Sequence, residues 1–143
     1  MNNVNFGPYL DSLDGLIRKA CAHLEGNLDE EQIELYDLAF VQAELLAART
    51  LISQTEQTAQ LLPVCQFFCA NAIVTITQKF AVRPQTFGLT AAELPSLDAL
   101  QDFLAPQAIA ALGRQYLDQG LVDDSLDDEK RIIRDTFKEF ADD

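Results

Sequence analysis

The sequence contains no tryptophan, a single histidine and only ten lysine and arginine residues, against 23 aspartate and glutamate residues. The resulting net charge of −13 opposes binding to phosphate backbones and to anionic membranes. The few basic residues occur singly or in pairs, as at Arg18-Lys19 and Lys130-Arg131, so no basic patch offsets this charge. We therefore expect no nucleic-acid partner.

Glycine and histidine are too sparse for the common cofactor and catalytic motifs. The six glycines are scattered, which excludes the usual dinucleotide and phosphate-binding loops. The single histidine, His23, has no recognisable serine or cysteine nucleophile motif to serve, and no Glu-x-x-His motif of a di-iron site occurs. We therefore assign no catalytic, cofactor-binding or metal-binding residues to this chain.

Long hydrophobic runs are also lacking. The N-terminus has neither a basic start nor an apolar segment, so it does not resemble a secretory signal, and we expect a cytoplasmic protein. The most apolar stretch, Leu61 to Ile76, falls short of the roughly 20 residues that cross a bilayer. It is interrupted by Pro63, Gln66 and Asn71, so we predict a buried helix and no membrane span.

Three cysteines, Cys21, Cys65 and Cys69, form an odd set without a secretory context, so reduced thiols are expected. Cys65 and Cys69 are four residues apart on one helical face and could supply two metal ligands, but a zinc site uses about four. Cys21 and His23 point to different helical faces. We therefore interpret the cysteines as small buried hydrophobic residues; a metal carrier or small helical enzyme using them is the alternative.

Apolar residues recur at the spacing of amphipathic helices along most of the chain. The β-branched run Ile73 to Thr77 leaves a strand as an alternative, but it lacks clean alternation and has no partner strand. We predict an all-α fold: a bundle of about three long helices with shorter C-terminal helices. The predicted helices are Pro8 to Glu25, Asp29 to Gln54, Pro63 to Val82, Ser96 to Leu104 and Pro106 to Gln119.

Two local features carry packing expectations. Gly15 lies in the middle of the first helix, where glycine is unfavourable, and close packing against a neighbour would explain it. In the second helix, small residues form a surface that another helix can approach closely, while leucines supply bulk around it, so we expect two buried faces. The small residues are Ala39, Ala43, Ala47 and Ala48.

The C-terminal stretch LDDEKRIIRDTFKEFADD has an apolar stripe typical of an amphipathic helix, yet it closes on two aspartates that oppose the helix dipole. It resembles the first helix of the acyl-CoA dehydrogenase family, matching it at Glu129, Arg134-Asp135 and Phe140-Ala141. The stretch Tyr36 to Ile52 resembles the alanine-rich helix, with its Ala-Ala-Arg step, of that family's C-terminal four-helix bundle.

The resemblance implies a fragment of a flavoprotein oxidoreductase of fatty acid metabolism. Residues 1–122 would be a non-catalytic helical accessory domain, and residues 123–143 an acidic linker and the first helix of an FAD-dependent core that oxidises acyl-CoA thioesters. FAD would belong to the full-length protein, since the family's catalytic and flavin-binding residues lie in later segments, so this chain alone would hold no cofactor. We then expect Phe137 and Phe140 to be less buried here than in the full-length protein.

Two partner assignments follow from these interpretations. The resemblance implies the downstream dehydrogenase core of the same polypeptide as a partner, so that the chain serves packing, assembly or docking. Composition and periodicity alone do not require a dehydrogenase core, and they leave open a free-standing acidic helical interaction or oligomerisation module. A homo-oligomer is an expectation under either interpretation.

Overall fold

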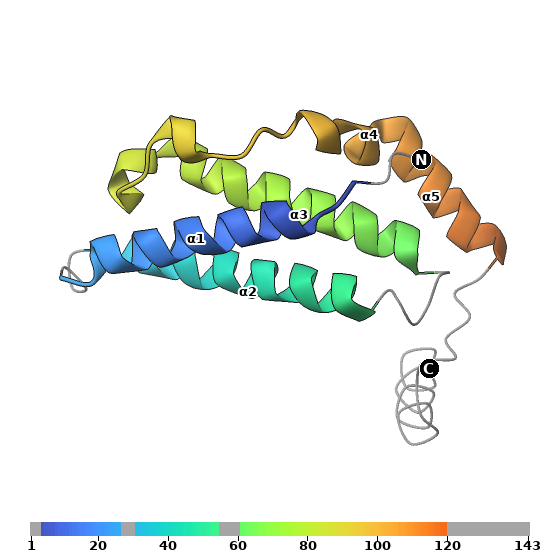
Figure 1. Cartoon of the computed structure of the whole chain (residues 1–143). Helices are drawn as coiled ribbons and strands as arrows, with labels where there is room; N and C mark the ends of the chain where they lie inside the picture. Colours follow the sequence, from blue (N-terminus) through green and yellow to red (C-terminus); the bar gives the residue numbers. More distant parts are fainter. Residues whose placement is uncertain (1–3, 27–30, 55–60, 120–143) are drawn as a thin grey trace, which may run out of the picture. The chain divides into compact units, whose positions relative to one another are not determined.

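The computed structural model describes residues 4–26, 31–54 and 61–119, and every regular element in these ranges is helical. The all-α prediction is therefore confirmed. The chain divides into two compact units, residues 1–112 and 113–143, and of the second only residues 113–119 are described. The elements are α1 (Gly7–Leu24), α2 (Gln32–Gln54), α3 (Leu62–Val82), η2 (Pro84–Phe87), η3 (Ala91–Glu93), η4 (Asp98–Leu100), α4 (Gln101–Leu104) and α5 (Pro106–Gln119) (Figure 1).

Proline sets the start of three of these helices. Pro8 and Pro63 occupy the first turns of α1 and α3, and Pro106 is the first residue of α5. The missing N–H costs nothing there, because the first amides of a helix have no intrahelical partner. The run Ile73 to Thr77 lies within α3, so the strand alternative is excluded.

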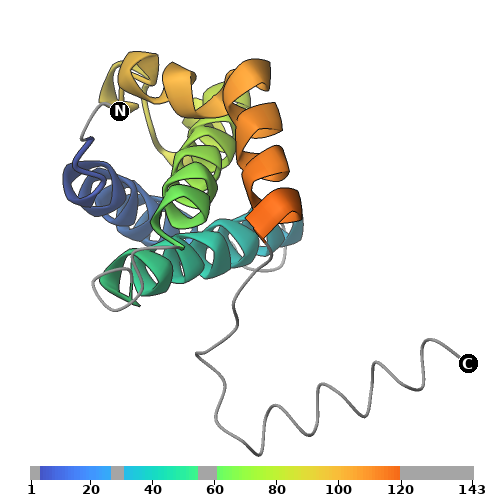
Figure 2. The same ribbon diagram turned by 90° about the vertical axis from the view of Figure 1, so that its right-hand side faces the viewer.

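The core of the first unit lies among α1, α2 and α3, which run alongside one another (Figure 1, Figure 2). Each helix contributes fully buried leucine, isoleucine or phenylalanine side chains, and each such side chain stabilises the fold by about 1.5–3 kcal/mol relative to an exposed one. Short elements after α3 close the core with Phe87, Leu89 and Leu100. The largest fully buried side chains of the three long helices are Leu13, Leu24, Leu45, Ile73, Ile76 and Phe80.

A tight turn after α3 returns the chain to α1. The ring of Phe87 packs edge-on against Phe80, with 5.1 Å between ring centroids. Gly88 then adopts φ 64°, and a Cβ on it would lie 2.6 Å from Cγ of His23. Both the positive φ and the close approach therefore require glycine at this position.

A polar contact fastens the next turn, η3, to α1. The ammonium of Lys19 donates to Glu93, and the backbone N–H of Thr90 donates to Oε2 of the same carboxylate at 2.8 Å. Hydrogen bonds from Lys19 and Thr90 lower the pKa of Glu93 from 4.5 to about 2. The carboxylate therefore stays charged, and this contact stays formed, well into the acidic range.

Two packing expectations are wrong. Gly15 is exposed, and a Cβ there would meet nothing within 4 Å, so no close neighbour explains it. On α2 only one face is buried: Ala48 is in the core, whereas Ala39 and Ala43 are exposed. Much of the face that was expected to receive a helix is thus uncovered by the described part of the chain.

Several predictions fall outside the described residues. These are the helix start at Asp29, the domain boundary between residues 122 and 123, the acidic linker, and the burial of Phe137 and Phe140. The predicted helix Ser96 to Leu104 is instead a 3-10 turn, η4, continued by the four-residue α4.

The two glycines give a matched pair of stability predictions. Gly15→Ala should raise the free energy of unfolding by about 0.5–1 kcal/mol, because alanine loses less backbone entropy in a helix and has room for its methyl group. Gly88→Ala should lower it, because of the positive φ and the clash with His23. Urea unfolding followed by circular dichroism measures both, and a destabilising Gly15→Ala would contradict the exposed placement of Gly15.

Candidate functional site

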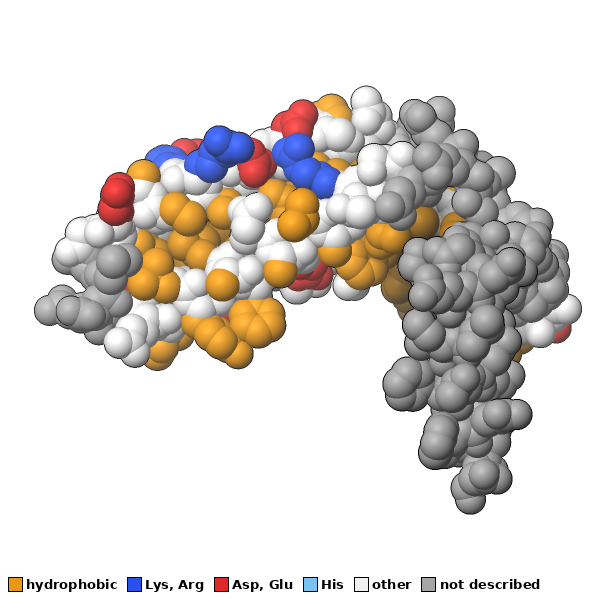
Figure 3. Space-filling view, turned by 90° about the horizontal axis from the view of Figure 1, so that it is seen from below, with side chains coloured by type: hydrophobic (Ala, Val, Ile, Leu, Met, Phe, Trp, Pro, Cys, Tyr) orange, Lys and Arg blue, Asp and Glu red, His pale blue; other side chains and the backbone are white. Residues whose placement is uncertain are grey.

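The outer face of α2 carries four of the eight exposed large hydrophobic side chains of the described residues. Four of its large hydrophobic side chains are more than half exposed: Ile33 at 67%, Tyr36 at 64%, Phe40 at 56% and Leu46 at 60%. Figure 3 looks onto this side of the molecule, where hydrophobic side chains run across the surface and charged ones gather mostly along one border. Exposed apolar side chains that cluster in this way mark interaction surfaces, whereas scattered ones do not.

Six residues of this face form a single stripe, which we call the α2 seam. They follow one another at alternating steps of three and four residues, the spacing by which one helix presents a continuous edge to another. Four of the six have no polar side-chain atom. The α2 seam consists of Ile33, Tyr36, Phe40, Ala43, Ala47 and Thr50.

Two side-chain contacts within α2 shape the seam. The rings of Tyr36 and Phe40 pack on each other with 4.6 Å between centroids, so they form one bulky ridge. The hydroxyl of Thr50 donates to the carbonyl of Leu46 at 2.9 Å, so it is already satisfied within α2 and can be covered without loss of a hydrogen bond.

Three of the four charged residues of α2 form ion pairs with its neighbours. On the α3 side, Arg83 bonds Glu34 and Asp37 at 3.1 and 3.3 Å, and Lys79 bonds Asp37 at 2.8 Å. The remaining acid, Glu44, is partly buried, and desolvation raises its pKa.

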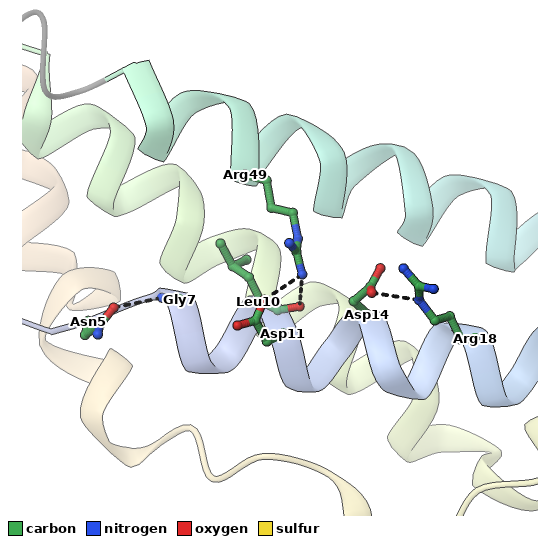
Figure 4. Close-up of polar contacts among 7 residues, drawn as sticks. All are labelled: Asn5, Gly7, Leu10, Asp11, Asp14, Arg18 and Arg49. Carbon is green, nitrogen blue, oxygen red and sulfur yellow. Dashed lines mark hydrogen bonds and ion pairs between the residues drawn. The ribbon is translucent and has the colours of Figure 1, made fainter.

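On the α1 side, Arg49 reaches across to the first turns of α1. Its guanidinium donates to the carbonyl of Leu10 at 3.2 Å and to the Asp11 carboxylate at 2.8 Å (Figure 4). With these contacts made, every exposed residue of α2 between Gln32 and Ser53 is uncharged. The exposed face of α2 is therefore neutral on a chain with a net charge of −13.

A pocket of about 440 Å³ lies between the start of α1 and the end of α2, lined by Gly7, Leu10, Asp11, Arg49, Thr50, Ile52 and Ser53. Its one basic group, Arg49, already pairs with Asp11. The lining offers no histidine or cysteine, and its one carboxylate is that of Asp11. Arg49 therefore links α2 to α1 through its contacts with Leu10 and Asp11.

The cysteines lie in two different environments. Cys65 and Cys69 are buried on α3 as predicted, whereas Cys21 is exposed on α1, so the prediction of burial is wrong for Cys21. The Cys69 thiol donates to the carbonyl of Ala48 at 3.4 Å. Burial, together with the neighbouring Cys65, raises the pKa of Cys69 to about 12, and burial raises that of Cys65. At both positions burial therefore favours the neutral thiol over the thiolate, which is the form that binds metal.

Other site types find no support among the described residues. Within residues 4–26, 31–54 and 61–119, no three histidine, cysteine, aspartate or glutamate side chains gather as metal ligands would. No helix in the same ranges is both long and apolar enough to cross a bilayer. Among the described residues, the α2 seam is thus the main candidate for a functional surface.

Comparison with known proteins adds no relative. No protein-family model matches the chain, and neither the curated proteins nor the solved structures give a match.

The thiol environments predict a reactivity pattern. One thiol, that of Cys21, should react rapidly with a chromogenic aromatic disulfide in the native protein, and all three should react after unfolding, because the thiolate is the reactive form. Cys21→Ser should remove the fast phase. Rapid reaction of a second thiol in native Cys21→Ser protein would contradict the buried placement of Cys65 and Cys69.

Proposed function

We propose that this chain is a non-catalytic helical assembly module, which joins a second copy of itself through the α2 seam. The observation that carries this proposal is the uncharged, apolar outer face of α2 on a strongly acidic chain. A helix face with three large exposed side chains, Ile33, Tyr36 and Phe40, costs solubility unless it is covered in the working state.

Charge favours a second copy as the partner. A basic protein would bind where the carboxylates are exposed, as electrostatic complementarity requires. The α2 seam instead suits a surface that is itself neutral and apolar, and another copy of the chain supplies one. The seam is also the place where two chains of charge −13 can meet without bringing unpaired like charges together.

The acyl-CoA dehydrogenase resemblance gives this module a proposed setting. Under that proposal, the module precedes an FAD-dependent core and helps to assemble it. Support comes from the sequence likeness alone, at Glu129, Arg134-Asp135 and Phe140-Ala141 and along Tyr36 to Ile52, the last of which forms most of α2. Assembly through α2 is compatible both with this setting and with a free-standing module.

The dehydrogenase setting is tested by the codons that follow Asp143. We expect an open reading frame that encodes several hundred further residues with a flavin-binding core. The corresponding longer protein should then absorb at about 450 nm, as bound flavin does, because the cofactor site lies in the core. A stop codon directly after Asp143 would overturn this setting and leave the assembly proposal intact.

Self-association is tested by placing one charge in the seam. Phe40→Glu should weaken the dimer by roughly 100-fold, because burying an unpaired charge costs about 3 kcal/mol. Sedimentation equilibrium over a concentration series measures the dissociation constant. Because Phe40 is 56% exposed, the monomer should keep its fold and its helical circular dichroism.

A matched control separates the seam from general apolar exposure. Val82 is 78% exposed at the end of α3, off the seam, so Val82→Glu makes the same change and should leave the dimer unaffected. Added salt should tighten the wild-type dimer, because it screens repulsion between the acidic chains. Monomeric wild-type protein at every concentration and salt level, or equal weakening by both variants, would overturn the proposal.

A further inference from the structure

We infer that the two copies meet in antiparallel orientation about a two-fold axis, with the bulky half of each α2 seam against the small half of the other. This inference rests on the proposed self-association and goes beyond it by assigning the orientation and the register. It follows from the order of side chains along the seam, which is not symmetric. The N-terminal half carries Ile33, Tyr36 and Phe40, and the C-terminal half carries Ala43, Ala47 and Thr50.

The antiparallel register pairs large residues with small ones throughout. With the two-fold axis placed midway along the seam, Phe40 meets Ala43 of the second copy, Tyr36 meets Ala47 and Ile33 meets Thr50. Each layer then has a similar combined volume, so two helices can keep one distance along the whole seam. An isologous contact of this kind uses the same residues on both copies.

A parallel arrangement fits poorly. It would place Phe40 against Phe40 and Tyr36 against Tyr36 at one end, which separates the helices by the width of two aromatic rings. At the other end Ala43 would face Ala43 and Ala47 would face Ala47 across a gap. Side chains that line such a gap lose their packing contacts. Parallel helix dipoles would also oppose the pairing, whereas antiparallel dipoles favour it.

One flank of the seam favours the antiparallel arrangement, and on the other flank neighbouring cations balance one of two like charges. On one flank it brings the exposed side chain of Leu46 toward the small, exposed Ala39 of the second copy, which covers another large apolar group. On the other flank it brings Glu44 toward Asp37 of the second copy. Lys79 and Arg83 already bond Asp37, so this carboxylate does not meet Glu44 as an unbalanced charge.

Disulfide trapping tests the orientation. Tyr36→Cys and Ala47→Cys are made separately in a Cys21→Ser background, so that Cys65 and Cys69, both buried, are the remaining native thiols. In the antiparallel register, positions 36 and 47 of two copies share a layer, whereas two copies of either position lie about 16 Å apart along the axis. A disulfide needs Cα atoms within about 7 Å. The mixture of the two variants should therefore give a cross-linked dimer joined between positions 36 and 47, and neither variant alone should.

A second pair of variants controls for the loss of the Tyr36 ring, which could itself weaken the dimer. Ile33→Cys mixed with Thr50→Cys keeps both aromatic residues of the seam and should behave in the same way. Cross-linking of each variant with itself, and not in the mixture, would show a parallel dimer and overturn this inference alone. A dimer in sedimentation that forms none of these disulfides would also overturn the register, whereas monomeric wild-type protein in sedimentation would overturn the proposed function with it.

Discussion

The positions of the charged residues on α2 determine which of its sides binds the neighbouring helices and which side is neutral. Arg49 binds the first turns of α1, and Glu34 and Asp37 bind Lys79 of α3 and Arg83 directly after it, so these charged side chains of α2 face the neighbouring helices. Because these groups are committed to the neighbouring helices, the outer surface of α2 is left without charge. One arrangement therefore accounts for the ion pairs that α2 forms with its neighbours and for the neutral seam on its outer side.

Most of the fold could be predicted from hydrophobic periodicity and proline. Pro8, Pro63 and Pro106 placed the starts of α1, α3 and α5 to within one residue, since proline is tolerated in the first turn of a helix and not in its interior. Gly15 could not be interpreted correctly, because a glycine in a helix has the same sequence pattern whether a neighbour touches it or water does. The exposure of Cys21 was missed for a related reason: its neighbours Ala20 and Leu24 are buried, but it points away from them.

The candidate site was only half predictable. The alanines of α2 indicated a surface that another helix can approach, and the structure leaves much of this surface uncovered by the described chain. A sequence pattern reports that a face is suited to packing, but it does not tell whether the partner lies in the same chain. The signal that could have identified the seam is the alternating spacing from Ile33 to Thr50 combined with the lack of charge at those six positions. Charged positions between them, such as Asp37 and Glu44, obscure that pattern, because the sequence does not tell that both side chains are partly buried.

The length of the seam limits the affinity of the proposed dimer. From Ile33 to Thr50 it spans about 26 Å of helix, and a single helix pair of that length buries an area at the lower end of stable interfaces. Repulsion between two acidic chains reduces the affinity further, and it disfavours the addition of a third copy to a closed two-fold dimer. A contact of this strength responds to local concentration. Attachment to a core that is itself oligomeric would raise that concentration to the millimolar range, so a weak seam can still fix the pairing of modules in a larger assembly.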